Sequence, residues 1–349
     1  MGSSALTLTG EFLDGATDLA VKVQGGTLKI LRNYFDGKWH FNFDSRIELD
    51  FATGVADPEP VSIDYNGTVY EKHDGRYIFG TYQIVIAQRD GQGRPTGYRY
   101  EEKGGRWELF GQAIGEAAMA MSAFGDRNGT VGKIRYDGQG RPAGMADRYD
   151  RQMIWIDYDG AGWISSVRDS ANRQVGYVHE GGRLTQVTDL LGAQAAYRYD
   201  GRGRIVAYTD PMGRSETITY NSDGLVTRVE DGAGDWRRFD YGYDTQSRQY
   251  YTLIETAGGR VTEMWYDEDG YLVRVDVDGR TEKQVQKEGR DTAVVHPDGG
   301  VTAKAYDIFD NVTRITHPEV RRKFGDVVDK RDKKINPTVG VGTIKIPRV

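Results

Sequence analysis

Short stretches of alternating apolar and polar residues run through most of this chain, and turns separate them. The segment RIVAYT at 204–209 is an example. Alternation with a period of two is typical of half-buried strands. Asp or Asn followed by Gly supplies the turns, because the side-chain oxygen binds nearby backbone N–H groups and Gly adopts positive φ without a Cβ clash. The pattern therefore predicts an all-β chain of short hairpins.

The stretch from Tyr199 to Val226 shows the unit that recurs. It contains turn signals at 199–204, 210–214 and 220–224, with short alternating runs between them. An aromatic–acid landmark returns every 20 to 23 residues, apart from a last step of 40 residues that spans two units, one of them degenerate. Such a period is typical of a repeat array, and a second turn lies near the middle of each unit. Two turns in each unit predict two strands in each unit. The landmarks are Tyr136-Asp137, Tyr158-Asp159, Val178-His179, Tyr199-Asp200, Tyr220-Asn221, Tyr243-Asp244, Tyr266-Asp267 and Tyr306-Asp307.

The remaining sequence divides the chain into four parts. Residues 126–318 form the regular array, and residues 58–125 carry hairpin signals at irregular spacing. Within the latter, residues 111–123 (GQAIGEAAMAMSA) are the one stretch that favours a helical turn. Residues 1–57 form an N-terminal β entry segment, and residues 319–349 form a basic tail or cap. Strands are expected in the entry segment at Leu19–Val23, Leu28–Leu31, Trp39–Phe43 and Arg46–Phe51.

Composition supports turn-rich β-structure. Gly accounts for 46 of 349 residues and Tyr for 22, so Gly stands well above its usual share of roughly 7%. The net charge of −6 gives no general attraction to nucleic acid. Cys is absent, which excludes disulfides and thiol chemistry. No apolar run is long enough for a membrane span, and no signal peptide is recognised at the start.

The repeat resembles that of the Rhs/YD-repeat family, which includes bacterial polymorphic toxins and the YD shells of teneurins. The matching motif is Tyr-Asp-x-x-Gly-Arg, present as YDGQGRP at 136–142 and YDGRGRI at 199–205. The half-unit appears as DPMGR at 210–214, with DRNG at 126–129 before it. The aromatic segment LRNYFDGKWHFNFDSRI at 31–47 resembles the one that precedes the array in bacterial members. The resemblance implies a β-sheet that spirals into a hollow shell, here partial or open, which holds a toxin until delivery.

Structural roles are predicted for the residues that carry the motif. We expect the acid to cap its turn, the Tyr to point to a common sheltered side, and the Arg to reach the preceding unit's Asp or to stack on Tyr. Asp200, Asp223, Asp231 and Asp269 are the expected capping residues among the acids beside Gly. The full set is Tyr136, Asp137, Gly140, Arg141, Tyr158, Asp159, Tyr199, Asp200, Gly203, Arg204, Asp210, Gly213, Arg214, Tyr220, Gly224, Tyr243, Asp244, Tyr266, Asp267, Gly270, Tyr306 and Asp307.

The sequence contains few candidates for catalytic or metal-binding residues. The five His residues have no zinc-binding spacing. The segment YDEDG at 266–270 is the best local candidate for calcium, although its acids also fit a turn. Asp210-Pro211-Met212-Gly213 matches the family's DPxG self-cleavage motif in its letters, but it lies within the array. We therefore expect no catalytic residue, metal or cofactor.

The function expected from the sequence is a non-catalytic scaffold or shell fragment of an Rhs-type toxin system. It would shield or present a passenger polypeptide, with a toxin and delivery machinery as partners, and would act outside the cell. The alternative is a surface adhesion or carbohydrate-binding module that uses exposed Tyr and Arg and takes a glycan as its partner. The third hypothesis is an aspartyl autoprotease fragment.

Overall fold

The fold was analysed in a computed structural model that describes residues 4–54, 59–79, 82–288, 291–297, 300–306 and 312–316. All regular elements among these residues are strands, so the all-β prediction is confirmed. No helix in the described part of the chain has the length and apolarity to cross a membrane. The chain divides into two compact units, one containing Leu13–Arg214 and the other Ala5–Phe12 with Ser215–Ile346.

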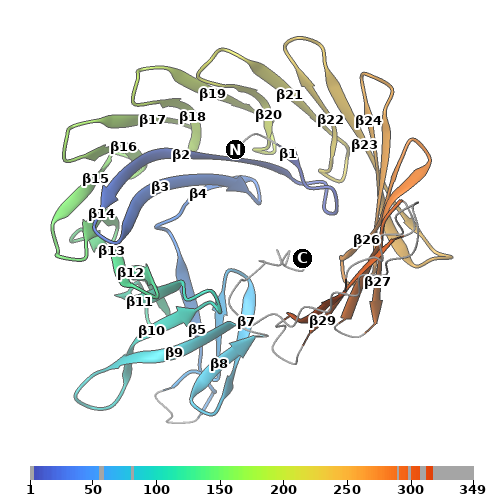
Figure 1. Cartoon of the computed structure of the whole chain (residues 1–349). Helices are drawn as coiled ribbons and strands as arrows, with labels where there is room; N and C mark the ends of the chain where they lie inside the picture. Colours follow the sequence, from blue (N-terminus) through green and yellow to red (C-terminus); the bar gives the residue numbers. More distant parts are fainter. Residues whose placement is uncertain are drawn as a thin grey trace, which may run out of the picture. The chain divides into compact units, whose positions relative to one another are not determined.

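The N-terminal sheet of the first unit consists of β2 (Phe12–Val23), β3 (Gly26–Phe35) and β4 (Lys38–Phe41), all antiparallel. The strand β1 (Ser4–Ala5) precedes it. Alternate residues of β3 are buried, namely Leu28, Ile30, Arg32 and Tyr34. Figure 1 shows this sheet along the inner side of the arc formed by β14 to β20. The strands expected in the entry segment are present, with longer bounds for β2 and β3.

The strands β5 to β12 form a closed ring. Each pairs with the next in an antiparallel manner, and β12 returns to β5 with Met119 opposite Ile47. The interior is filled by aromatic side chains, among them Tyr77, Tyr98 and Phe110. The bounds are β5 (Arg46–Asp50), β6 (Ser62–Tyr65), β7 (Thr68–His73), β8 (Arg76–Phe79), β9 (Tyr82–Arg89), β10 (Pro95–Glu101), β11 (Trp107–Ala113) and β12 (Ala118–Asp126).

The prediction of a helical turn at 111–123 is wrong. The strand β11 extends to Ala113, and β12 begins at Ala118 after a short loop. Strand β12 buries Met119, Ala120, Met121 and Ala123, so both faces of its first half are covered. Pairing with β5, β11 and β13 determines the structure here, because the tertiary environment overrides the helix propensity of Ala and Met.

The repeat strands continue from β12 as an antiparallel meander in which two strands correspond to one repeat, as predicted. The first unit contains β13 (Gly129–Tyr136), β14 (Pro142–Asp147), β15 (Gln152–Tyr158), β16 (Ile164–Asp169), β17 (Gln174–Glu180), β18 (Arg183–Thr188), β19 (Gln194–Tyr199) and β20 (Ile205–Thr209). One face of this sheet is buried, and its side chains include Ile154, Val167, Tyr177 and Tyr197.

The second unit contains the same kind of meander. Its strands are β21 (Ser215–Tyr220), β22 (Val226–Asp231), β23 (Trp236–Asp244), β24 (Gln249–Thr256), β25 (Val261–Tyr266), β26 (Leu272–Val277), β27 (Arg280–Glu288), β28 (Asp291–Val295), β29 (Val301–Tyr306) and β30 (Val312–Thr316). Residues 5–12 pack on this unit, where Gly10 accepts a backbone hydrogen bond from Val226 at 2.8 Å. The predicted boundaries at 57, 125 and 318 stay predictions, and the tail at 319–349 lies outside the described residues.

Candidate functional site

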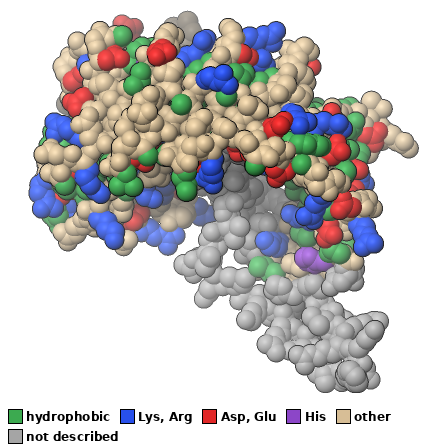
Figure 2. Space-filling view, turned by 90° about the horizontal axis from the view of Figure 1, so that it is seen from above, with side chains coloured by type: hydrophobic (Ala, Val, Ile, Leu, Met, Phe, Trp, Pro, Cys, Tyr) green, Lys and Arg blue, Asp and Glu red, His purple; other side chains and the backbone are tan. Residues whose placement is uncertain are grey.

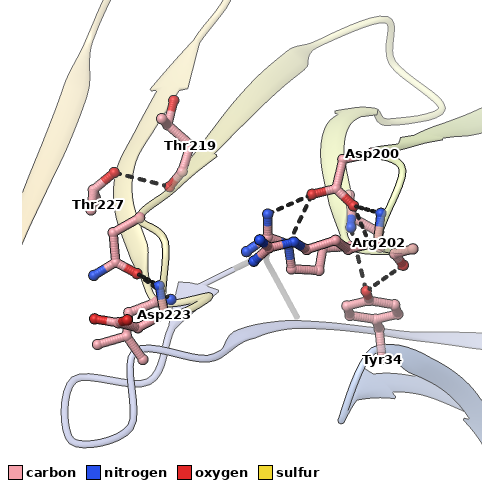
Figure 3. Close-up of polar contacts among 11 residues, drawn as sticks. Tyr34, Asp200, Arg202, Thr219, Asp223 and Thr227 are labelled. Atoms are coloured by element: carbon pink, nitrogen blue, oxygen red, sulfur yellow. Dashed lines mark hydrogen bonds and ion pairs between the residues drawn. The ribbon is translucent and has the colours of Figure 1, made fainter.

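The acid–glycine corner is a fixed hydrogen-bonded unit, and the turn at Asp200 shows it (Figure 3). The carboxylate Oδ1 of Asp200 accepts the backbone N–H groups of Arg202 and Arg204, both at 2.9 Å. Its Oδ2 accepts Nε of Arg204 at 2.8 Å. The Gly203 N–H donates to the Asp200 carbonyl at 3.0 Å. One carboxylate thus satisfies both turn amides and the guanidinium that follows.

The corner repeats along the chain, although Arg is not required for it. Asp159 and Asp267 bind the same two amides, with Trp163 and Tyr271 at the Arg position. Asp231 also caps its turn. In two turns the sequence pointed to the wrong residue, because Asn221 and Asp267 are the caps and Asp223 and Asp269 donate their N–H groups to them. Corners with both Asp and Arg are Asp90–Arg94, Asp137–Arg141, Asp147–Arg151, Asp169–Arg173, Asp200–Arg204 and Asp210–Arg214.

The corner holds its carboxylate in the charged form. Burial raises the pKa of Asp200, but hydrogen bonds from Arg204 and Arg202 outweigh it and lower the pKa below its ordinary value. The pKa values of Asp137, Asp147, Asp169 and Asp210 are lowered as well. Asp244 lies in a longer hairpin loop, where bonds from the Ser247 hydroxyl and from two backbone amides lower its pKa as well.

The glycine of the corner has a positive φ, at Gly140, Gly203, Gly213, Gly224 and Gly270. At Gly203 the constraint is double. Its φ is +87°, and a Cβ there would meet the guanidinium of Arg183 at 3.0 Å. The guanidinium of Arg183, which belongs to the preceding repeat, therefore lies directly over this glycine.

Most motif tyrosines lie at a β-bulge, and in three of them the hydroxyl reaches a preceding strand. The register shifts just before Tyr136, Tyr158 and Tyr199, and equally before Tyr220, Tyr266 and Tyr306. The hydroxyl then donates to a backbone carbonyl about one strand pair earlier. These bonds are Tyr136 to Met121 (2.6 Å), Tyr158 to Pro142 (2.7 Å) and Tyr199 to Leu184 (2.6 Å).

The second unit departs from this rule at Tyr243. The β23–β24 pairing has no register shift, and Tyr243 is 41% exposed. Tyr241, two residues earlier, donates to the Val226 carbonyl at 2.8 Å. It takes the place in its repeat that Tyr199 has in the earlier one. Tyr220 is half-buried, and Tyr266 is buried with its hydroxyl against Thr7. Asp307 and the side chain of Tyr306 lie outside the described residues.

The arginines link consecutive units, but through rings rather than through the preceding unit's Asp. Arg141 pairs with Asp137 of its own turn at 2.9 Å. Its guanidinium also lies 4.1 Å from the ring centroid of Tyr158 in the next unit. Arg183 lies over Tyr199 in the same way, at 5.8 Å. The predicted stacking of Arg on Tyr is therefore present, and Arg141 binds the Asp of its own turn in place of the preceding repeat's Asp.

The tyrosine face of the first unit holds the N-terminal sheet through a buried polar cluster. The guanidinium of Arg32 in β3 donates from Nε to Asp18 of β2 at 2.9 Å. It also donates from Nη1 to the Tyr197 hydroxyl at 2.7 Å. The Tyr177 hydroxyl donates to Asp18 at 2.8 Å. All four side chains are buried. We call the buried face of β13–β20 with Tyr177, Tyr197 and Tyr199 the tyrosine wall.

The electrostatics of this cluster follow from burial. Loss of solvent raises the pKa of Asp18, although Arg32 and the Tyr177 hydroxyl oppose it. Burial lowers the pKa of Arg32, but Tyr197 and Asp18 raise this pKa by more than burial lowers it. The guanidinium therefore stays charged. Burial, then Asp18, raises the pKa of Tyr177 well above its ordinary value. The phenols are therefore neutral, and they solvate a buried ion pair in place of water.

Two further contacts extend this interface. Trp39 of β4 donates from Nε1 to the Tyr199 hydroxyl at 3.0 Å. Tyr34 of β3 reaches the backbone of the repeat, where its hydroxyl donates to the Gly203 carbonyl at 3.4 Å and accepts the Ile205 N–H at 3.3 Å (Figure 3). The phenols of the wall thus bind side chains of the sheet, and Tyr34 of the sheet in turn binds the backbone of the repeat.

Sequence reasoning missed Asp18, Arg32, Tyr177 and Tyr197. One signal was present. In the alternating run Leu28, Ile30, Arg32 and Tyr34, the Arg falls on the apolar side of a predicted strand. A cation on a buried face requires a partner. One partner of Arg32, the phenol of Tyr197, is more than a hundred residues away in the sequence.

Outward-facing aromatic rings of the repeats carry arginines. Trp155 has the guanidinium of Arg168 at 4.8 Å, and Trp265 has that of Arg274 at 4.4 Å. Trp163 is exposed and stacks on His179. On the face shown in Figure 2, basic, acidic and apolar side chains are interspersed.

The described residues contain no group of acids and histidines arranged to hold a metal ion. In the segment at 266–270, Asp267 caps its turn and Glu268 pairs with Arg248 at 2.7 Å. The carboxylate of Asp210, in the DPxG-like segment, accepts the Met212 and Arg214 N–H groups and the Arg214 side chain. It has the same structural bonds as the carboxylates of the other corners.

The family model RHS Repeat matches residues 179–215 and 199–236. Solved structures with similarity include TcdB2-TccC3-TEV (12% identity, 88% of this chain, TM-score 0.42) and TcdB2-TccC3 (9% identity, 93% of this chain, TM-score 0.38). A third is the Photorhabdus luminescens Tc holotoxin pore carrying TccC3-D651A (9% identity, 90% of this chain, TM-score 0.29).

The chain spans only 18%, 23% and 22% of the length of those three chains. No curated protein matches it. The matched segments coincide with β17 to β22, where the Asp200 corner, the Tyr199 bulge and the half-unit turn at Asp210 lie. Residues 179–236 therefore carry the sequence signature of Rhs repeats.

Proposed function

We propose that this chain is a non-catalytic structural wall of an Rhs-type shell, which holds polypeptide against its tyrosine-lined face. The observation that carries the proposal is the contact between the tyrosine wall and residues 13–41 of the same chain. There, the phenols of Tyr177, Tyr197 and Tyr199 bind a buried ion pair and an indole N–H, and Tyr34 of the sheet binds the backbone of the repeat. The wall therefore already has a polypeptide as its occupant.

Tyrosine suits this role for physical reasons. The phenol hydroxyl both donates and accepts, so it can satisfy a carboxylate, as at Tyr177, or a guanidinium, as at Tyr197. The ring supplies a rigid apolar surface at low cost in conformational entropy. A face built from such groups can cover polypeptides of different sequence, as a shell that carries variable passengers requires. We propose a toxin polypeptide as the passenger and delivery outside the cell as the context, as the family resemblance implies.

The alternative of a carbohydrate-binding module has weaker support. It requires bare outward rings for sugars to stack on, whereas Arg168 covers Trp155 and Arg274 covers Trp265. The exposed ring of Trp163 is the best remaining candidate. Glycan binding that disappears in Trp163→Ala would favour this alternative over the wall.

Hydrogen exchange of the backbone amides in β2 and β3 tests the proposal. In the full chain these amides exchange slowly, because the sheet is held by the wall. The double variant Tyr177→Phe/Tyr197→Phe raises their exchange rates by at least about tenfold, since two hydrogen bonds to a buried ion pair are lost.

Tyr158→Phe is the matched control. Its hydroxyl binds the Pro142 carbonyl within the repeat sheet and does not reach β2 or β3. Their exchange rates stay at the wild-type value in this variant. If the amides of β2 and β3 exchange in the wild type as fast as in an unfolded chain, the wall does not hold a polypeptide and the proposal fails.

A further inference from the structure

The two edges of the repeat sheet in the first unit carry different side chains. In an antiparallel meander alternate turns lie at opposite edges. At one edge the third turn position is held by Gln139, Ala161 and Arg202, none of them a large apolar residue. At the opposite edge the same position is held by Tyr149, Ala171, Leu191 and Met212. We call Leu190, Leu191 and Met212, at adjacent turns of that edge, the apolar tips.

The apolar tips are exposed to an unusual degree. Leu191 is 93% exposed and Met212 is 79% exposed, and Leu190 is exposed as well. Tyr149 on the same edge is 56% exposed, and its hydroxyl binds Gln24. Single exposed apolar side chains are common on protein surfaces, but Leu190, Leu191 and Met212 lie on two adjacent turns of one edge, which points to a partner. The third turn positions of the opposite edge carry no such side chain, and its exposed ring, Trp163, follows the glycine of its turn.

The fold does not require these side chains. At the third turn position only the backbone N–H is used, and it donates to the capping carboxylate. The distance is 2.8 Å at Leu191 and 2.9 Å at both Met212 and Ala171. Ala171 makes the same turn with a methyl group alone. The additional carbon atoms of Leu191 and Met212 therefore contribute to something other than the turn.

Guanidinium groups flank the tips. Arg173 and Arg214 close the turns at Asp169 and Asp210, and both side chains point outward. The Arg214 side chain is 76% exposed, whereas the carboxylate of Asp210 beneath it is largely buried. The outer surface of this edge therefore presents cationic hydrogen-bond donors beside apolar tips. Phosphate oxygens are the acceptors that a guanidinium fits best.

We propose that this edge of the first unit binds a phospholipid surface, with Leu190, Leu191 and Met212 inserted at the headgroup level and Arg173 and Arg214 bound to lipid phosphates. The tips project from turns, and neighbouring turns on one edge are two strands apart, roughly 10 Å. A row of separate projections suits a soft planar surface, whereas a protein partner would need a matching pocket for each. The net charge of −6 opposes approach to an anionic surface, so the apolar tips are essential to binding.

Flotation of the full chain with phospholipid vesicles tests this inference. With vesicles of phosphatidylcholine containing roughly 30% phosphatidylserine, the wild-type chain floats with the lipid. Leu191→Ser/Met212→Ser lowers the partition coefficient by at least about tenfold, because two apolar side chains no longer leave water. Ala171→Leu, which adds a tip between those at Tyr149 and Leu191, raises it.

Two controls make the result specific. Gln139→Ser/Ala161→Ser changes the same turn position on the opposite edge and leaves partition unchanged. The urea unfolding midpoint of Leu191→Ser/Met212→Ser matches the wild type, which separates loss of binding from loss of fold. A wild-type chain that fails to float, or a double variant that floats equally well, overturns the inference.

Discussion

At the residue scale, the chain is built on the corner formed by Asp, Gly and Arg. The Asp carboxylate accepts two backbone N–H groups and, where Arg follows, a charge-assisted pair of bonds. The turn at Asn221 shows that the two functions are separable, because its amide oxygen caps the same two N–H groups with Leu225 at the Arg position. Capping is therefore the essential part, and the ion pair adds to it.

Substitutions at Asp169 separate these two contributions. Asp169→Ala removes the cap and the partner of Arg173, and we expect it to lower the free energy of unfolding by about 1–3 kcal/mol. Asp169→Asn keeps the acceptor and loses only the ion pair, so its cost is below about 1 kcal/mol. Urea unfolding of both variants measures the difference. Equal costs would show that the cap contributes nothing beyond the ion pair.

The glycines of one corner differ in what they tolerate. Gly203 has a φ of +87° and lies against Arg183, whereas Gly201 two residues earlier has open space around its Cα. Gly203→Ala is expected to lower the free energy of unfolding by about 1–2 kcal/mol, because it forces both backbone strain and displacement of the guanidinium. Gly201→Ala changes it by less than about 0.5 kcal/mol. Thermal unfolding compares the two, and a larger loss at Gly201 would contradict this geometry.

At the element scale, the defining feature is the N-terminal sheet seated on the tyrosine wall. Asp18 and Arg32 come from adjacent strands of that sheet, so the ion pair belongs to the sheet and the phenols complete its solvation. The repeat strands alone would leave Tyr177 and Tyr197 without these polar partners. The sheet and the wall therefore stabilise each other.

Removal of one charge from this interface is expected to be costly. Arg32→Met leaves Asp18 buried without its partner, and we predict a loss of about 3–5 kcal/mol in the free energy of unfolding. Adding Asp18→Leu to that variant recovers a large part of it, because the unpaired charge is gone. Arg248→Met, which breaks the exposed pair with Glu268, costs less than about 1 kcal/mol. Similar losses in the two single variants would argue against a buried pair at Arg32.

The sequence predicted the strands well because their pattern is local. Alternation and Asp–Gly turns located β13 to β26, and the motif identified the corners. It did not predict that Tyr241 takes the position expected for Tyr243, because the bulge depends on strand register and β23 pairs with β24 without a shift. It also did not predict the contact of Arg32 with Tyr197, which joins residues far apart in the chain. Long-range pairing leaves little trace in local pattern.

At the scale of the whole molecule, the many corner carboxylates with lowered pKa values determine the response to acid. A carboxylate with a folded pKa below its unfolded value of about 3.9 adds stability above that value and loses it as the pH falls through the folded pKa. The raised pKa values of Asp18 and Asp44 act in the opposite direction, but these are two groups against the set at Asp137, Asp147, Asp169, Asp200 and Asp210.

The chain is therefore expected to lose stability between about pH 4 and pH 2, because the unfolded state binds more protons than the folded state in that interval. Urea midpoints measured across this range decline steadily. In Asp169→Asn the decline is shallower, since one titrating corner has been removed. A midpoint that stays constant to about pH 2 would be incompatible with charged corner carboxylates in the folded state.

The central claim is that the tyrosine wall binds the chain's own N-terminal sheet, and a double-mutant cycle between Trp39 and Tyr199 tests it most directly. Both groups are neutral, and they meet in a single hydrogen bond of 3.0 Å. Free energies of unfolding are measured for the wild type, Trp39→Phe, Tyr199→Phe and the double variant. A coupling energy of about 0.5–1.5 kcal/mol is predicted, and strictly additive effects would contradict contact between sheet and wall.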